Sequence, residues 1–225
     1  MKIIKDYKPY VSIISKTRLF ANIPESHFDS VLKFLHASVR SYEKDELILR
    51  LGDPLLYSGI VLSGTVEGSF ISENYNKINM NHFTAGRSFA EALACVHTKH
   101  SPVQLCALHD CEIMFLDLSV ILSKESCDCE YKHQLSINLI EILASQNVFS
   151  NLKLRIMSQK ALRDRILIYL HSLVPDADGM VSVPFTQTAL AEFLGVNRSA
   201  LSRELGRMQD EGLILVEAKK MKLLL

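Results

Sequence analysis

Apolar side chains recur along the chain with different spacings, and each spacing predicts a different kind of element. Residues 1–36 carry short apolar stripes at helical spacing, split near Pro24, a residue that suits the first turn of a helix. From Val39 to Leu116 the period falls to two, and polar or glycine-containing turns separate the apolar runs. This regular spacing favours an antiparallel sandwich or barrel over alternating strands and helices.

The expected strands are short and end at turn residues. They cover residues 41–50, 57–62, 65–71, 78–83, 103–108 and 112–116, with turns at 51–54, 63–64 and 74–77. A short helix is expected at 118–122 and another at 162–173, and a short strand at 180–183.

Residues 128–156 predict one long helix, which Asp128 can cap. Its main stripe follows a spacing of four and three, as in helices that pair with one another. The stripe consists of Leu135, Leu139, Ile142, Gln146 and Phe149. Such a stripe faces either the core of its own chain or a second chain. We expect a seam between two chains, with the polar Gln146 fixing its register, and the core-facing alternative stays open.

Residues 185–214 predict two short helices joined by a tight turn and followed by a strand. Thr186 and Asn197 can cap the two helices, and Gly195 suits the left-handed residue that ends the first. The second helix has an apolar back, and residues 198–207 hold three arginines against one glutamate. Such a helix fits the major groove of DNA, although a solvated helical hairpin has the same coarse pattern.

The run Ala191-x-x-Leu-Gly-Val-x-Arg-x-x-Leu-Ser-Arg203 resembles the helix-turn-helix of the Crp/Fnr family of bacterial transcription regulators. The order of strands and turns over residues 19–120 resembles the cyclic-nucleotide-binding-type jelly roll of the same family. The resemblance implies an α+β protein with three parts. These are an N-terminal antiparallel β jelly roll (a double-stranded β-helix) that acts as sensor over residues 1–127, a dimerisation helix over 128–156, and a winged helix-turn-helix over 157–225.

The resemblance also implies which residues touch double-stranded DNA. We expect base contacts from Arg198, Ser199, Ser202 and Arg203, phosphate contacts from Thr186, Gln187, Thr188 and Asn197, and backbone contacts from Lys219 and Lys220 in the wing. A homodimer would read a palindromic operator with half-sites about 34 Å apart, and RNA polymerase would be a partner of an activator. Well-known members carry a glutamate where this chain has Ser199, so no operator sequence is carried over.

Family members that bind cyclic nucleotides have Phe-Gly-Glu followed, about ten residues on, by Arg-Ser-Ala. This chain has Phe89, Ala90 and Glu91 at the first motif, and His100 and Ser101 at the second. These five residues are the expected effector site. Because a histidine that is mostly neutral at pH 7 replaces the bidentate arginine, a cyclic nucleotide is disfavoured. A different small molecule, or none, remains open, and the sequence names no cofactor.

The five cysteines leave a thiol-responsive or metal-responsive regulator as an alternative. Cys127 and Cys129 form a CxC pair near His133, whereas zinc pairs prefer CxxC, and we expect no metal site. Cys106 and Cys111 stand in apolar strand-like contexts that favour core positions. A haem would need an axial ligand, for which residue type alone offers His82, His97, His100 and His109.

Composition narrows the remaining classes. The 225 residues include 25 basic and 25 acidic side chains, so DNA binding would depend on local charge. No apolar run approaches 18 residues and the N-terminus lacks a signal-peptide core, so a cytoplasmic protein is expected. No P-loop, nucleophile elbow or HExxH occurs, so an enzyme is not expected. The alternative from another class is a small-molecule-binding or enzymatic β-roll protein without DNA binding.

Overall fold

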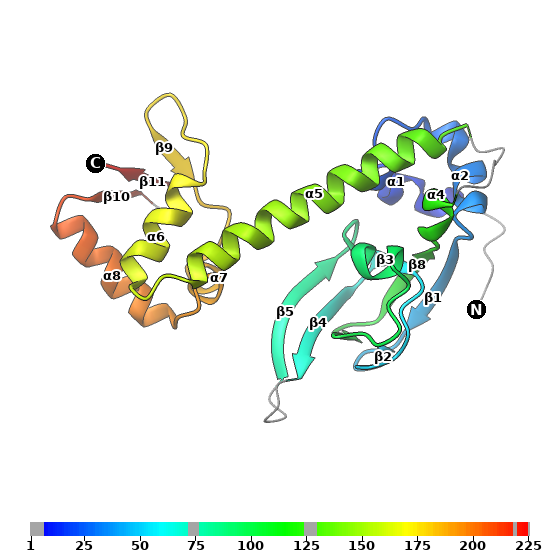
Figure 1. The fold of residues 1–225 in the computed structure, drawn as a ribbon, viewed down its shortest axis with the longest axis horizontal. Coiled ribbons are helices and arrows are strands. Elements are labelled where there is room, and N and C mark those ends of the chain that lie inside the picture. Colours follow the sequence, from blue (N-terminus) through cyan, green and yellow to red (C-terminus); the bar gives the residue numbers. More distant parts are fainter. Residues whose placement is uncertain (1–6, 72–76, 124–129, 218–219, 225) are drawn as a thin grey trace. The chain divides into compact units, whose positions relative to one another are not determined.

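The protein, here a computed structural model, is described for residues 7–71, 77–123, 130–217 and 220–224, with the backbone alone for 70, 71 and 77–81 (Figure 1). It divides into two units, residues 1–143 and 144–225, and one long helix, α5 (Lys132–Met157), belongs to both. In the described part, no helix combines the length and apolarity needed to span a bilayer. The predictions for Asp128, Cys127, Cys129 and Lys219 lie outside the described residues.

The N-terminal unit begins with short helical pieces. They are 3-10 turns at Lys8–Tyr10, Arg18–Phe20 and Glu25–His27, with the α-helices α1 (Val11–Ile14) and α2 (Phe28–Phe34). Their buried side chains share a core with α4 (Ser119–Leu122) and the first turns of α5. On α5, Asn138 donates two hydrogen bonds of 2.8 Å, to the carbonyls of Leu19 and Ala21, and so fixes the 3-10 turn beside the helix.

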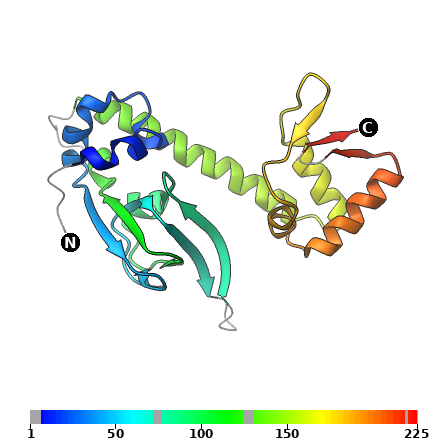
Figure 2. The ribbon, with the colours of Figure 1, turned by 180° about the vertical axis from the view of Figure 1, so that it is seen from behind.

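Two four-stranded antiparallel sheets form the rest of this unit, which confirms the predicted β sandwich (Figure 2). One sheet has the order β1-β8-β3-β6 and the other β2-β7-β4-β5. The strands are β1 (Ser38–Tyr42), β2 (Leu47–Leu49), β3 (Ser58–Ser63), β4 (Thr65–Ile71), β5 (Lys77–Thr84), β6 (Ser88–Phe89), β7 (Gln104–Ala107) and β8 (Cys111–Leu116). The sequence did not predict β6 or the short helix α3 (Glu91–Cys95) that follows it.

The prediction of a single strand at residues 41–50 is wrong, because two strands, β1 and β2, share this stretch. The chain turns at residues 43–46, where Asp45 has a φ of +67° and the Glu46 amide donates to the Glu43 carbonyl at 3.1 Å. This run is fully charged and exposed, so it has no apolar side chain to bury. The turn sends β1 into one sheet and β2 into the other, and thereby closes one side of the sandwich.

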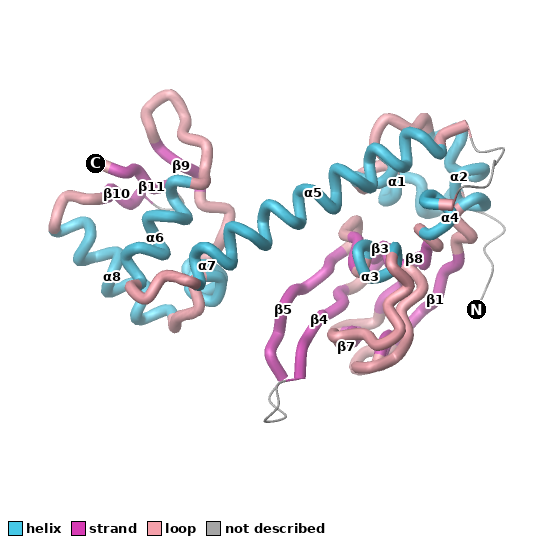
Figure 3. Tube along the Cα trace, viewed as in Figure 1, coloured by secondary structure: helices cyan, strands magenta, loops and turns pink. Residues whose placement is uncertain are grey.

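The C-terminal unit is a winged helix-turn-helix, as expected (Figure 3). It contains α6 (Leu162–His171), α7 (Gln187–Phe193) and α8 (Arg198–Asp210), with β9 (Met180–Ser182), β10 (Ile214–Glu217) and β11 (Lys220–Leu223) in the sheet order β10-β11-β9. One core joins the three helices to the sheet, and Ile156 near the end of α5 lies in it.

The predicted dimer seam on α5 needs a correction. Leu135, Leu139 and Ile142 are buried in the core of their own N-terminal unit, so these three side chains have no free surface for a second chain. For these three residues the other alternative is correct, and they face the core of their own chain. Gln146 and Phe149, the other two residues of that stripe, are exposed.

Two cations hold the end of α7 at the helix-turn-helix turn. Lys153 from α5 donates to the Phe193 carbonyl, and Arg165 from α6 donates to the Leu194 carbonyl at 3.0 Å. These carbonyls have no partner within their own helix, because a helix leaves its last carbonyls unpaired. Gly195 follows with a φ of +71°, as the sequence predicted.

We predict that Gly195→Ala destabilises the C-terminal unit by about 1–3 kcal/mol. A Cβ at this position would stand 2.7 Å from the Met157 methyl group, and its φ is one that alanine adopts with strain. Chemical denaturation of the whole chain measures the effect. The matched control is Gly206→Ala, within α8, where a Cβ meets nothing within 4 Å. That change should stabilise by roughly 0.5–1 kcal/mol, and an equal loss in both variants would contradict the strain.

Candidate nucleic-acid interface and sensor site

The candidate DNA-reading face lies on α8 and at the start of α7. Leu201, Leu205 and Met208 bury the back of α8. The eight base- and phosphate-contacting residues expected outside the wing are all exposed: Thr186, Gln187, Thr188, Asn197, Arg198, Ser199, Ser202 and Arg203. The predicted contact residues at the starts of α7 and α8 are therefore all accessible to a ligand.

Capping side chains set where both helices begin. Thr186 accepts from the Ala189 amide at 3.2 Å, and Asn197 accepts from the Ala200 amide at 2.8 Å, as the sequence predicted. The Asn197 carboxamide oxygen also accepts from the Ser199 hydroxyl at 2.8 Å. In α8 the remaining free amides and the helix dipole point out of this first turn, which favours a phosphate there.

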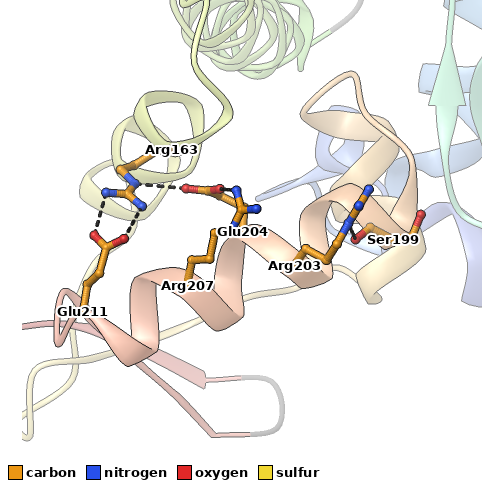
Figure 4. A network of polar contacts seen from close by, with 6 residues as sticks. All are labelled: Arg163, Ser199, Arg203, Glu204, Arg207 and Glu211. Atoms are coloured by element: carbon orange, nitrogen blue, oxygen red, sulfur yellow. Dashed lines mark hydrogen bonds and ion pairs between the residues drawn. The ribbon is translucent and has the colours of Figure 1, made fainter.

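An arginine that the sequence analysis missed pairs with Glu204 on α8 and with Glu211 directly after that helix. Arg163 on α6 donates from Nε to Glu204 at 3.0 Å and from both terminal nitrogens to Glu211 at 2.7 and 2.8 Å (Figure 4). This pairing holds the pKa of the Glu211 carboxyl below its usual range. The network ties α6 to α8 and neutralises carboxylates that would repel a phosphate backbone.

The exposed front of α8 keeps its positive charge. Arg203 donates from Nε to the Ser199 carbonyl at 3.3 Å and lies nearer the start of α8 than Arg207 and Glu211 in Figure 4. Arg198 is exposed in the first turn. Lys220 of the wing donates to the Asp176 carboxylate at 2.8 Å, so its charge is partly balanced within the unit.

The expected effector residues fall into two groups with separate partners. Glu91 is buried at the start of α3 and accepts from the Ser88 hydroxyl, while Phe89 is buried between the sheets. The His100 ring lies 3.3 Å from the Gly52 carbonyl, and the Ser101 hydroxyl donates to the Val103 carbonyl at 2.7 Å. Ser101 thus has its hydrogen bond within its own loop.

One of the spaces beside Phe89 and Ala90 is apolar. A cavity of about 150 Å³ is lined there by Gly68, Phe83, Phe89, Ala90, Leu93, Val103 and Leu105. The rings of Phe83 and Phe89 pack with their centroids 5.5 Å apart. A wall without polar side chains gives a cyclic phosphate and its ribose no partners, which agrees with the unfavourable sequence substitutions.

The predicted core position is confirmed for Cys111 but not for Cys106, which alternates with the buried Leu105 and Ala107 on β7. Cys95 and Cys106 are partly buried and Cys111 is buried, and all three are free thiols. Burial raises the pKa of Cys111 to about 11, so this thiol stays protonated and a poor nucleophile at neutral pH. Within the described ranges, no three His, Cys, Asp or Glu side chains come together in a group that could hold a metal.

A capped recognition helix with a wing, on a chain that also folds a β sandwich, defines a DNA-binding transcription regulator with a sensor domain. Residues 164–224 match the Crp-like helix-turn-helix domain, and residues 39–124 match the cyclic nucleotide-binding domain. The chain belongs to the Crp/Fnr family.

Individual relatives align with nearly the whole chain, but their sequence identity to it is low. A candidate HTH-type transcriptional regulator of Porphyra purpurea, ycf28, is 22% identical over 218 residues that span 92% of this chain and 87% of the relative. The catabolite activator protein of Thermus thermophilus is 19% identical with a TM-score of 0.55, covering 92% of this chain and 93% of that one. The c-di-GMP-responsive regulator CLP of Xanthomonas campestris is 20% identical with a TM-score of 0.53, covering 87% and 98%. These two likenesses show a shared fold.

We predict that Ala90→Gly leaves stability unchanged or raises it by up to about 1 kcal/mol. Ala90 has a φ of +64°, so the relief of left-handed strain offsets the greater freedom of glycine in the unfolded chain. Thermal and urea unfolding measure the change. Ala94→Gly, in the buried helical interior of α3, is the matched control and should lose about 1 kcal/mol or more. A similar loss at position 90 would show that the backbone there is unstrained.

Proposed function

We propose that two copies of this chain bind a palindromic operator, with the two α8 helices in successive major grooves and an effector in the N-terminal unit controlling the affinity. The observation that carries the proposal is the exposed, capped and cationic front of α8. Operator binding would take place in the cytoplasm, where the DNA is. If the regulator activates transcription, RNA polymerase is a further partner.

Base recognition falls to the first half of α8. Arg198 and Arg203 can donate pairs of hydrogen bonds to a guanine edge, while Ser199 and Ser202 are short enough to let the helix lie deep in the groove. Thr186, Gln187, Thr188 and Asn197, at the starts of α7 and α8, would hold the flanking phosphates. Lys219 and Lys220 in the wing remain proposed backbone contacts.

The proposed dimer face lies on the opposite side of α5 from the residues of the sequence-based seam. Ile137, Ile140, Ala144 and Val148 follow a spacing of three and four and share one helical face. Ile140 is 65% and Val148 70% exposed in the single chain. A repeated apolar stripe of this kind is stabilised when it pairs with a second copy of itself.

Arg203→Ala is expected to weaken operator binding by about 1–3 kcal/mol and to relax the sequence preference at one base position, because the variant loses a paired contact with a base. Competition binding against operators varied at single positions measures both effects. Arg87→Ala removes an exposed arginine from the N-terminal unit and should leave affinity unchanged. An equal loss on every sequence, with a shallower salt dependence, would make Arg203 a phosphate contact instead.

Val148→Glu should shift the protein from dimer to monomer, because it buries a charge in the proposed face. Analytical ultracentrifugation of the whole chain reads the mass directly, and 25.4 kDa is the mass of one chain. Gln146→Glu places the same charge on the opposite face of α5 and should remain dimeric. Dissociation of the Gln146 variant alone would overturn the proposed face and place the contact on the side of α5 that carries Gln146.

A further inference from the structure

We propose that a second cavity of the N-terminal unit, separate from residues 91, 100 and 101, binds a small amphipathic carboxylic acid through Arg40. The cavity has a volume of about 220 Å³ and lies among β1, β2, β8 and residues 54–57. Its lining includes Ser38, Arg40, Leu49 and Phe115. Glu91, His100 and Ser101, the polar residues of the expected effector site, are absent from this lining.

Strand register places the polar side chains of β1 on the face that looks toward the second sheet, where Ser38 and Tyr42 are buried and Arg40 is exposed. Ser38, Arg40 and Tyr42 alternate along β1 and therefore point to one side. Arg40 pairs with Ile113 on β8, whose side chain is buried in the core between the sheets. Tyr42 lies in the same core, so the face that carries Arg40 is the inner face of the sandwich.

The polar part of the lining offers hydrogen-bond donors for an anion. The Ser38 hydroxyl is buried, with the residue 1% exposed, and no described atom is its hydrogen-bond partner. A buried hydroxyl without a partner costs free energy, which an acceptor on a ligand would recover. Arg40 carries the one formal charge in the lining, and its guanidinium carbon lies 5.8 Å from the centre of the Phe115 ring. A carboxylate supplies two acceptor oxygens to an arginine.

The remaining walls of the cavity are apolar, so the rest of the ligand must be apolar as well. Leu49, Leu55, Leu105 and Phe89 line the cavity, and Leu56 and Tyr57 are exposed at its border. Its volume is below the roughly 300–1,000 Å³ of sites for drug-sized ligands, which favours a short aliphatic chain. These features together select a molecule of the size of octanoate, with the carboxylate on Arg40 and the chain between the sheets.

Occupancy of this cavity does not depend on DNA binding, whereas the role of the acid as effector rests on the proposed function. The cavity shares Phe89, Ala90 and Leu105 with the smaller apolar cavity beside the expected effector site. A ligand that presses on Phe89 would therefore act on the segment that leads into α3. Binding without DNA tests the cavity, and operator binding without the acid tests the proposed function.

The experiment is calorimetric titration of the whole chain with sodium octanoate at pH 7, with 1-octanol as the neutral probe of equal length. We expect saturable binding of one octanoate per chain and at least about tenfold weaker binding of octanol. Arg40→Gln should weaken octanoate binding by about tenfold or more and Arg40→Lys by less, since lysine keeps the charge. Arg87→Gln is the matched control, because it removes an exposed arginine outside the lining, and it should bind as the unchanged protein does.

A second variant tests the location without touching the charge. Leu56→Trp enlarges a 45% exposed side chain at the cavity border, where the fold tolerates extra volume, and should also weaken octanoate binding. The proposal is overturned by the absence of saturable octanoate binding, by octanol binding as tightly, or by equal losses in Arg40→Gln and Arg87→Gln. Operator affinity that changes with octanoate, and fails to change in Arg40→Gln, would support the effector role, while unchanged affinity would overturn that role.

Discussion

The helix-turn-helix depends on hydrogen bonds to the last backbone carbonyls at the end of α7. A tight turn between two helices leaves the last carbonyls of the first helix without partners, and an apolar core cannot supply them. Here an ammonium group from α5 and a guanidinium group from α6 bind the carbonyls of Phe193 and Leu194. Burial, and after it the nearby charge of Arg165, lowers the pKa of Lys153. The Phe193 ring, whose centre lies 4.4 Å from the ammonium nitrogen, favours the charged form. The turn, and the direction in which α8 leaves it, follow from these contacts.

Local signals explain what the sequence could predict. Thr186, Gly195 and Asn197 each act on neighbours within four residues, so their roles are readable from the order of residues alone. Arg163 was missed for the opposite reason, since its partners stand 41 and 48 positions away and any arginine on α6 has the same appearance in sequence. The same limit applies to α5, where spacing revealed an apolar stripe but could not show that the core of its own chain covers its first half.

The sensor unit has the fold of a cyclic nucleotide-binding domain, and its residues at the two motif positions have hydrogen-bond partners of their own. Ala90 keeps a left-handed backbone that usually favours glycine, and Ser88 and Val103 occupy the hydrogen-bonding groups of Glu91 and Ser101. The rings of Phe83 and Phe89 pack against each other in the wall of the neighbouring cavity. The larger cavity owes its polar corner to a β1 strand whose inner face was invisible before the register with β8 was known. Motif matching locates residues that resemble a site, whereas strand register decides which of them face a ligand.

The middle of α5 has a consequence for how sequence change acts on this protein. Every side chain from Ala144 to Asn151 is exposed in the single chain, and Phe149, whose ring packs beside Phe193, is the one aromatic residue among them. The residue types at these positions are constrained mainly by helix propensity and by the surface of any partner. Variation there is therefore nearly neutral for folding, and its effects concentrate in the choice of partner. New pairing specificities can arise in this segment without passing through an unstable intermediate.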